Sequence, residues 1–160
     1  MSFAEILRLH VSEAINGHRH FLARMAPGGR SHDRPLLDFF CDFVEKRGQY
    51  QNQLNLRSNG LQPLVHGARV LALKQSLTVT NTLTRLAELA GHWVLKDLFA
   101  SDLRAACGFI TLLRISRHLE DQAAGREPDS FVDLVSLNVV QRKMLKESFT
   151  VISQLQEFIK

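Results

Sequence analysis

The longest run of helical periodicity reads LKDLFASDLRAACGFITLLRISRHLEDQAA and extends from residue 95 to residue 124. Apolar side chains recur in it at steps of three and four, which places them on one face of an α-helix. Gly125 follows directly and is a typical residue for closing a helix. We therefore predict a long helix here as the centre of the fold. Its buried face should carry Leu98, Phe99, Ala106, Ile110 and Leu113.

The N-terminal part predicts one helix, a connector and a strand. The first helix extends from Ser2 to about Met25, and Ser2 with Glu5 forms a capping box. Residues 26–35 are rich in proline and glycine and predict a loop. The alternating residues 53–56 predict a short strand, or a hairpin within residues 40–57. One face of the first helix carries Phe3, Leu7, His10, Ala14, Phe21 and Met25.

Three more helices complete the prediction. The second follows the strand-ending segment 58–60 and tolerates Pro63 in its first turn. The third begins at a cap around Thr80 and Asn81 and ends at Gly91, and the last begins at Ser136. We predict a mainly α fold, a bundle of about five helices in a single domain over residues 1–160. The expected buried positions are Leu64, Ala68, Leu71 and Ala72, then Leu83, Leu86, Ala87 and Ala90, and finally the stripe Val140, Met144, Val151, Leu155 and Phe158, with Leu145, Phe149 and Ile152 beside it.

The composition of the chain argues against several classes of protein. The 160 residues are 45% hydrophobic and carry a formal net charge of +4, which is too mild for a nucleic-acid-binding footprint. No apolar run reaches the roughly 18 residues that a membrane helix requires, and no leader of the secretory type opens the chain. Cys41 and Cys107 lack metal or disulfide spacing. We expect a cytoplasmic protein with reduced thiols that binds neither membrane nor nucleic acid.

The motifs of several enzyme classes are missing from the sequence. It has neither a Gly-Lys phosphate loop nor a Gly-x-Gly-x-x-Gly fingerprint. His18 and His20 are two residues apart, so on a helix they point in different directions and favour no metal site. Only Glu127 and Asp129 have the spacing of paired metal-binding carboxylates, and no Gly-Ser turn precedes them. We therefore expect no catalytic residues, no metal and no cofactor in this chain.

Ionisable residues enter an otherwise apolar face of the long helix. Cys107, Ile110, Arg114, His118 and Asp121 follow one another at steps of three and four. Arg114 could pair with an acidic neighbour such as Asp121 at the end of the bundle. Alternatively, Arg114 and His118 could face an anionic substrate, because a guanidinium group matches the geometry of phosphate and carboxylate.

A second basic cluster is predicted from Arg57 at the end of the strand, Arg69 on the second helix and Arg85 on the third. Beside it, the segment from Thr78 to Thr82 offers hydroxyl groups and the N-terminus of a helix, which can receive an anion. Simple N-capping of that helix is the alternative explanation.

Several segments of the sequence together match a known bacterial family. They are Arg34-Pro-Leu-Leu-Asp-Phe-Phe40, the stretch from Leu54 to Leu73, Thr80-Asn-Thr-Leu-Thr-Arg-Leu86, Leu113-Arg114, the stretch from Gly125 to Asp133, Leu145-Lys-Glu-Ser-Phe149 and Leu155-Gln156. In these segments, which cover nearly the whole chain from about Pro35 in order, the chain resembles the family of nucleotidyltransferase substrate-binding domains, which are helical domains of bacterial signal-transduction proteins. The stretch from Leu54 to Leu73 also looks like an element of the bacterial uridylyl- and adenylyltransferases, with Arg57 and His66 where a Lys and an Asp are usual.

The resemblance implies a non-catalytic domain that positions an acceptor or nucleotide for a nucleotidyltransferase domain in the same or another chain. Magnesium and nucleotide are then expected only in that catalytic partner, and CBS and cyclic-nucleotide-binding-like domains are further expected neighbours. The long helix of the family commonly carries His-Gln after its Arg, whereas this chain has Arg117-His118. The expected substrate contacts are Arg57, Arg69, Thr82, Arg85, Arg114 and His118.

Two alternatives remain open from the sequence. The chain could be a helical dimerisation or interaction module that binds no small molecule, with its arginines at an interface rim. It could also be a ribonuclease of a related helical type, in which Arg and His share one helix near a dimer seam. Arg114 and His118 are four residues apart, slightly off the spacing associated with that motif.

Overall fold

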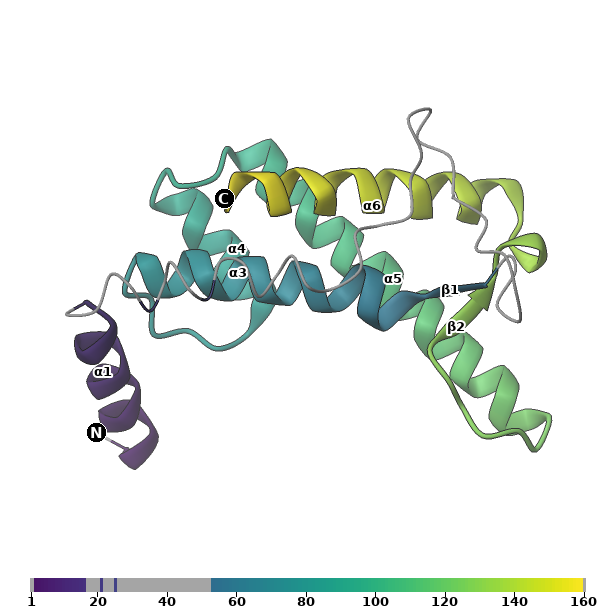
Figure 1. Ribbon diagram of the computed structural model, residues 1–160, viewed down its shortest axis with the longest axis horizontal. Coiled ribbons are helices and arrows are strands. Elements are labelled where there is room, and N and C mark those ends of the chain that lie inside the picture. Colours follow the sequence, from purple (N-terminus) through teal and green to yellow (C-terminus); the bar gives the residue numbers. More distant parts are fainter. Residues whose placement is uncertain (1, 17–20, 22–24, 26–52, 160) are drawn as a thin grey trace.

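The computed structural model describes residues 2–16, 21, 25 and 53–159, and it is mainly helical with one small antiparallel sheet (Figure 1). The predicted fold class is thereby confirmed. The predicted connector at residues 26–35 lies outside the described residues. The elements are α1 (Phe3–Asn16), β1 (Gln53–Asn55), η1 (Arg57–Leu61), α3 (Gln62–Lys74), α4 (Thr82–Gly91), α5 (Asp97–Ala123), β2 (Phe131–Asp133), η2 (Leu134–Ser136) and α6 (Val139–Phe158).

The core lies between α3, α4, α5 and α6. Helices α3 and α6 run side by side along the long axis, and α5 crosses them obliquely while contacting both α4 and α6 (Figure 1). The C-terminal turns of α5 project away from the other helices. No helix among the described residues has both the length and the apolarity to cross a bilayer. The largest fully buried side chains include Leu64, Leu86, Leu103, Ile110, Leu145, Phe149, Ile152 and Leu155.

The boundaries of α3, α4 and α5 agree with local sequence signals. Pro63 occupies the first turn of α3, and the side chain of Asn81 caps α4. Gly125, just after α5, has a φ of +68°. The predicted buried faces are confirmed for α3 and for most of α5. They were wrong at three positions, because Leu83, Ala87 and Leu98 are exposed.

Helix α6 begins two residues later than predicted, and its buried face is shifted within the predicted positions. Its N-cap is Asn138, which forms a capping box with Gln141, whereas Ser136 belongs to the turn η2. Leu155 of the predicted stripe is buried, as are Leu145, Phe149 and Ile152, which were predicted beside it. Val140, Met144 and Phe158 of the predicted stripe are exposed. The buried face comprises Leu145, Ser148, Phe149, Ile152, Leu155 and Gln156. Two adjacent stripes both follow the helical period, and only the packing decides which of them is buried.

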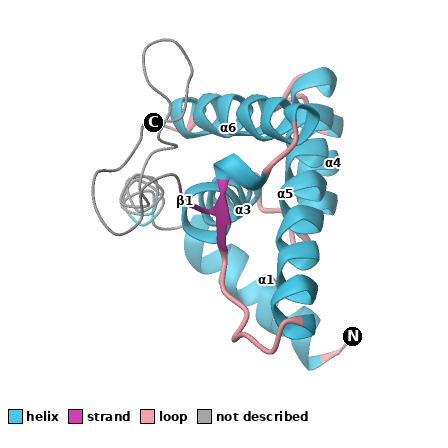
Figure 2. Cartoon of the chain, turned by 90° about the vertical axis from the view of Figure 1, so that its right-hand side faces the viewer, coloured by secondary structure: helices cyan, strands magenta, loops and turns pink. Residues whose placement is uncertain are grey.

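The small sheet pairs segments that lie far apart in the sequence. Strand β1, as predicted, occupies residues 53–55, and it pairs antiparallel with β2, which the sequence did not reveal. The central pair, Leu54 and Val132, is buried. Strand β1 also contacts η1, and Figure 2 looks onto the end of the molecule where this sheet lies. Residues 40–52, where a local hairpin would begin, lie outside the described part of the chain.

The predicted interruption after β1 is a wide helical turn rather than a loop. Residues 57–61 form the π-helical turn η1, which leads directly into α3. Gly60 allows this turn to approach the core closely. A Cβ at this position would lie 3.1 Å from Cδ1 of Ile110 and 3.3 Å from Cε1 of Phe149.

Helix α1 starts with the predicted capping box. The amide of Ser2 donates to the Glu5 carboxylate at 2.6 Å, and the amide of Glu5 donates to Oγ of Ser2 at 3.3 Å. The predicted apolar face is wrong, because none of its residues is buried: Phe3, Leu7, His10, Ala14 and Phe21 are exposed and Met25 is half-buried. The buried residue of α1 is Ile15, which lies outside that face. Residues 17–20 and 22–24, in the C-terminal part of the predicted helix, lie outside the described residues.

Candidate functional site: two polar clusters

The first cluster, called the α3–α4 cluster, consists of Arg69, Thr82 and Arg85. Thr82 is the first residue of α4, and Arg85 lies one turn further on the same side. Nε of Arg85 donates to the carbonyl oxygen of Val79 at 2.9 Å, which fixes the direction of the side chain. Burial and the neighbouring charge of Arg69 lower the pKa of the Arg85 guanidinium. Two like charges from different helices are therefore held close to each other.

Neither arginine of the α3–α4 cluster forms an ion pair with a carboxylate among the described residues. The ion pairs found there are His10–Glu13, Arg117–Glu120 and Arg126–Asp121. Like charges that stand together without a counterion repel each other, and a bound anion would relieve that repulsion. This cluster can therefore serve as a receptor for a phosphate or carboxylate group.

Capping already uses part of the N-terminus of α4. Oδ1 of Asn81 accepts hydrogen bonds from the amides of Leu83 at 2.9 Å and Thr84 at 3.2 Å. The structure thus shows the N-capping alternative for these two amide groups. The candidate anion-binding groups of the cluster are therefore the side chains of Arg69 and Arg85.

The second cluster, called the α5 cluster, consists of Arg114, Arg117 and His118 on α5 together with Ser130 before β2. Nε of Arg114 donates to Oγ of Ser130 at 3.2 Å. Nε of Arg117 and Nε2 of His118 are buried, and neither atom has a hydrogen-bond partner in the described part of the chain. Buried polar atoms normally have partners, so this arrangement leaves two places where a ligand atom or a water molecule could bind.

The predicted pairing of Arg114 with Asp121 is not formed. Asp121 instead accepts two hydrogen bonds from Arg126, at 2.6 Å from Nη2 and 3.0 Å from Nε. Arg126 follows Gly125, whose left-handed backbone folds the chain back over the last turn of α5. The fold therefore satisfies the acidic residue locally and leaves Arg114 to Ser130.

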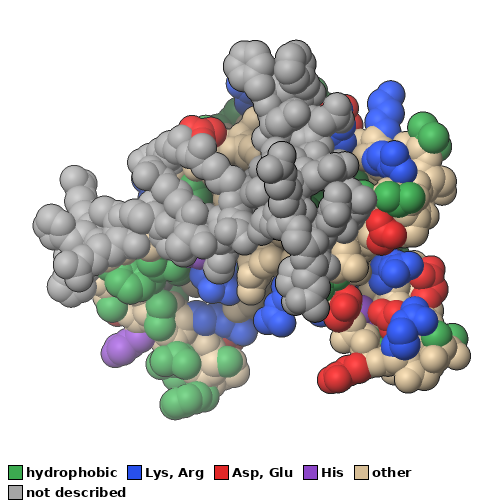
Figure 3. Space-filling model, turned by 45° about the vertical axis from the view of Figure 1, so that its right-hand side comes forward, with side chains coloured by type: hydrophobic (Ala, Val, Ile, Leu, Met, Phe, Trp, Pro, Cys, Tyr) green, Lys and Arg blue, Asp and Glu red, His purple; other side chains and the backbone are tan. Residues whose placement is uncertain are grey.

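Contrary to the prediction, Arg57 does not lie in the α3–α4 cluster. It is exposed at the start of η1, about 17 Å of helix axis away from Arg69. Its neighbour Leu56 donates a backbone hydrogen bond to the carbonyl oxygen of Ser130 at 2.8 Å. Arg57 thus stands at the end of the bundle that carries the α5 cluster. On the face shown in Figure 3, basic side chains gather in more than one place, and in one of these they alternate with acidic ones.

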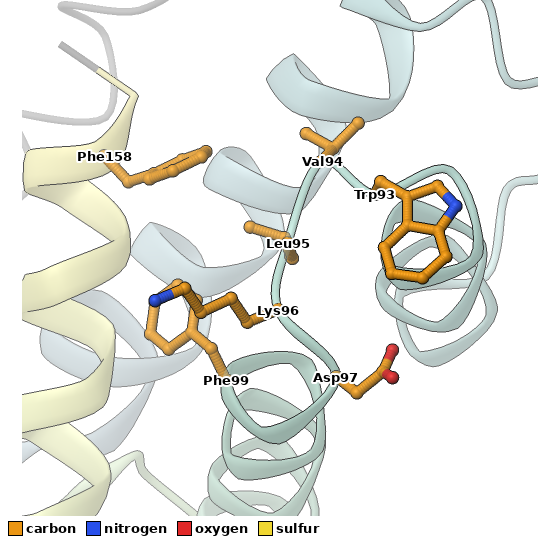
Figure 4. Close-up of a pocket in the computed structure, with 7 residues that line it drawn as sticks. All are labelled: Trp93, Val94, Leu95, Lys96, Asp97, Phe99 and Phe158. Carbon is orange, nitrogen blue, oxygen red and sulfur yellow. The ribbon is translucent and has the colours of Figure 1, made fainter.

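Two surface hollows lie elsewhere. The first, of about 530 Å³, is lined mainly by Trp93, Leu95, Phe99 and Phe158, with Lys96 and Asp97 at its edge (Figure 4). The second, of about 370 Å³, lies between α5 and α6. None of the six predicted contact residues lines either hollow. The first hollow was not predicted from the sequence, where the single tryptophan, Trp93, shortly after Gly91, was the available signal.

The family to which the chain belongs follows from comparison with protein-family models. The model described as "Putative nucleotidyltransferase substrate binding domain" matches residues 19–160. The chain belongs to this family. No curated protein and no solved structure gives a significant match. The resemblance noted from the sequence is thereby confirmed at the level of the family.

The matched range of this substrate-binding domain includes both clusters and all described elements from β1 to α6, whereas α1 precedes it. The family name implies association with a nucleotidyltransferase domain. Among the residues that the structure describes, no three His, Cys, Asp or Glu side chains are grouped as metal ligands would be. The predicted absence of a metal stays a prediction, since His18 and His20 are not described.

Proposed function

We propose that this domain makes and breaks no bonds itself but holds an anionic group of the acceptor or nucleotide against a nucleotidyltransferase domain. The observation that carries the proposal is that Arg69 and Arg85 lie on the contacting helices α3 and α4, where burial and the charge of Arg69 lower the pKa of Arg85, and that neither pairs with a carboxylate among the described residues. Family membership supplies the context for this pair. Thr82 offers a hydroxyl beside it, and Arg114 and His118 are the second proposed contact region.

The wider setting belongs to the same proposal. We place the domain in a cytoplasmic signal-transduction protein, with the transferase domain in the same or another chain. Magnesium and nucleotide would be held by the transferase, and CBS and cyclic-nucleotide-binding-like domains would be further neighbours. The family resemblance supports these points.

Titration calorimetry with pyrophosphate and with ATP tests the site. Arg69 is exposed, so Arg69→Glu should fold normally and weaken binding of either probe by about tenfold or more, because it replaces an attractive charge by a repulsive one. Arg104→Glu is the matched control, since Arg104 is an exposed arginine of α5 outside both clusters. Equal affinities for the wild type and Arg69→Glu would refute the assignment.

The α5 cluster is tested with the domain joined to its transferase. Arg114→Ala combined with Arg69→Ala should lower nucleotide affinity more than either change alone if both regions contact the same substrate. Unchanged affinity in the double variant would remove both regions from the site. Circular dichroism of each variant should confirm that the helical content is retained.

A further inference from the structure

One face of α5 carries a regular series of residues that no described element covers. Leu98, Ser101, Ala105, Gly108, Leu112, Ile115, Leu119 and Gln122 follow one another at alternating steps of three and four. All of them are exposed or, for Gly108, half-buried. Leu112 is 67% exposed, Ile115 49% and Leu119 60%. We call this series the α5 seam, because its spacing is that of the contact positions of a coiled coil.

The two halves of the α5 seam differ in the size of their side chains. Ser101, Ala105 and Gly108 are small, whereas Leu112, Ile115 and Leu119 one to three turns later are large. A Cβ added at Gly108 would meet no atom within 4 Å. The N-terminal half therefore leaves open space beside the helix, and the C-terminal half projects apolar side chains into solvent.

Only one orientation matches these halves to each other. If two copies of α5 lie antiparallel around a two-fold axis near residue 110, Leu112 meets the partner's Gly108, Ile115 meets the partner's Ala105 and Leu119 meets the partner's Ser101. Each of these three layers then combines a large residue with a small one, as close packing requires. A parallel pair would place large side chains against each other at one end and leave a gap at the other.

The hollow between α5 and α6 lies beside the small half of the seam. Its wall includes Ala105 and Phe109 from α5 and Met144 and Val151 from α6. Met144 is 47% exposed although its side chain is apolar. The hollow thus extends the apolar surface next to the positions that the partner's Ile115 and Leu119 would reach. In Figure 2, α5 runs along one edge of the molecule.

We propose that the α5 seam is a self-complementary interface through which two copies of this chain form an antiparallel, two-fold symmetric dimer. The partner at the seam is a second copy of this chain. Small residues occupy the first half of the seam and large residues the second half, so when a second copy runs in the opposite direction its large residues face the small ones of the first. A two-fold interface requires this property, since each surface must match itself. The contact of Leu98 with the partner's Gln122 closes the seam at both ends.

Gly108→Leu tests the seam without disturbing the isolated fold. The added side chain enters open space, and leucine favours a helix interior more than glycine does, so the chain should remain folded. In the dimer it would collide with the partner's Leu112. We expect sedimentation equilibrium of the full 160-residue chain to show a dimer for the wild type and a dissociation constant raised at least tenfold for Gly108→Leu. Gly91→Leu, at another open glycine outside the seam, is the control and should dimerise normally.

A compensating variant makes the test specific for the antiparallel register. In Gly108→Leu combined with Leu112→Ala, each large side chain again meets a small one, so dimerisation should return. A parallel pair or an unrelated surface predicts no such rescue. The proposal is overturned if the wild type is monomeric at high micromolar concentration, if Gly108→Leu dimerises as tightly as the wild type, or if the double variant stays monomeric. Capture of a transferase domain by a monomeric wild-type seam would assign the face to that partner instead.

Discussion

At the residue scale, three helix ends use the same hydrogen-bonded turn with different residues in its left-handed position. These residues are Ser76 after α3, Trp93 after α4 and Gly125 after α5, with φ values of 56°, 57° and 68°. In each turn the next amide donates to a carbonyl five residues earlier, as in Val94 to Leu89 at 2.9 Å. This is the Schellman arrangement, in which glycine is the least strained residue. Trp93 therefore occupies a position that local backbone energetics disfavour.

Trp93→Gly should therefore keep or raise stability. The indole is 91% exposed, so few packing contacts are lost, while release of the left-handed strain contributes up to about 1 kcal/mol. Urea denaturation followed by circular dichroism measures the effect. The reverse change, Gly125→Ala, is the counterpart and should lower stability by about 1 kcal/mol. A lower urea midpoint for Trp93→Gly would show that the indole contributes packing energy that its exposure does not reveal.

The thiol of Cys107 should make the stability of the fold depend on pH. Burial raises the pKa of its thiol, and a hydrogen bond with Thr111 opposes this more weakly. Because the folded pKa lies above the unfolded value, the thiol's contribution to stability is complete at low pH and is lost as the pH rises through the folded pKa. The urea midpoint should therefore fall more between neutral and alkaline pH for the wild type than for Cys107→Ala. Identical pH profiles would contradict the raised pKa.

At the scale of single elements, the start of α6 shows why one cap signal is not sufficient. Ser136 and Asn138 are both good capping residues, but only Asn138 has a Gln three residues later. The reciprocal bonds, Gln141 amide to Asn138 Oδ1 at 2.9 Å and Asn138 amide to Gln141 Oε1 at 3.1 Å, identify the cap. Ser136 Oγ donates to the Asp133 carbonyl oxygen inside the preceding turn.

Asn138→Ala should consequently destabilise the fold by about 1 kcal/mol, the usual contribution of an N-cap. Ser136→Ala should have a clearly smaller effect, because Ser136 is exposed and bonds no amide of α6. Thermal denaturation of both variants provides the comparison. If Ser136→Ala were the more harmful change, the helix would begin before Asn138 in solution.

The elements that the sequence predicted well are those defined by local chemistry. Asn81 and Gly125 mark helix ends through bonds and backbone angles that involve only neighbouring residues, whereas Gly91 is simply the last residue of α4 and Trp93 takes the left-handed position after it. Strand β2 is only three residues long and is specified by its partner β1, so no local period reveals it. The buried face of α6 depends on the position of α5, which periodicity does not contain.

At the scale of the whole molecule, the candidate site depends on packing between helices. The sequence predicted Arg69 and Arg85 as one cluster, and the contact between α3 and α4 brings them together. The position of Arg57 could not be predicted in the same way, because the sequence predicted an interruption at residues 58–60. In the structure η1 joins α3 without a break, and Arg57 therefore stands at the other end of a continuous helical segment. The sequence also could not show that Asp121 pairs with Arg126 and not with Arg114, since that pairing depends on the turn at Gly125.

Helix α1 contributes little to the main core. Ile15 is its only residue with a described side chain that is buried, and α1 contacts α3 among the described elements. Deletion of residues 2–16 should therefore change the melting temperature by only a few degrees, which corresponds to less than about 2 kcal/mol. Differential scanning calorimetry tests this, and loss of the cooperative transition would show that α1 is integral to the fold.

The pairing of β1 with β2 has a consequence for the order of folding. Between these strands the chain passes through α3, α4 and α5, so their three-residue ladder must close a long loop, and the entropy of that closure is repaid only once the intervening helices have docked. The pairing of β1 with β2 thus forms late in folding, after the helical bundle has assembled. Pulsed hydrogen exchange during refolding should find the amides of β1 and β2 acquiring protection after those of α5.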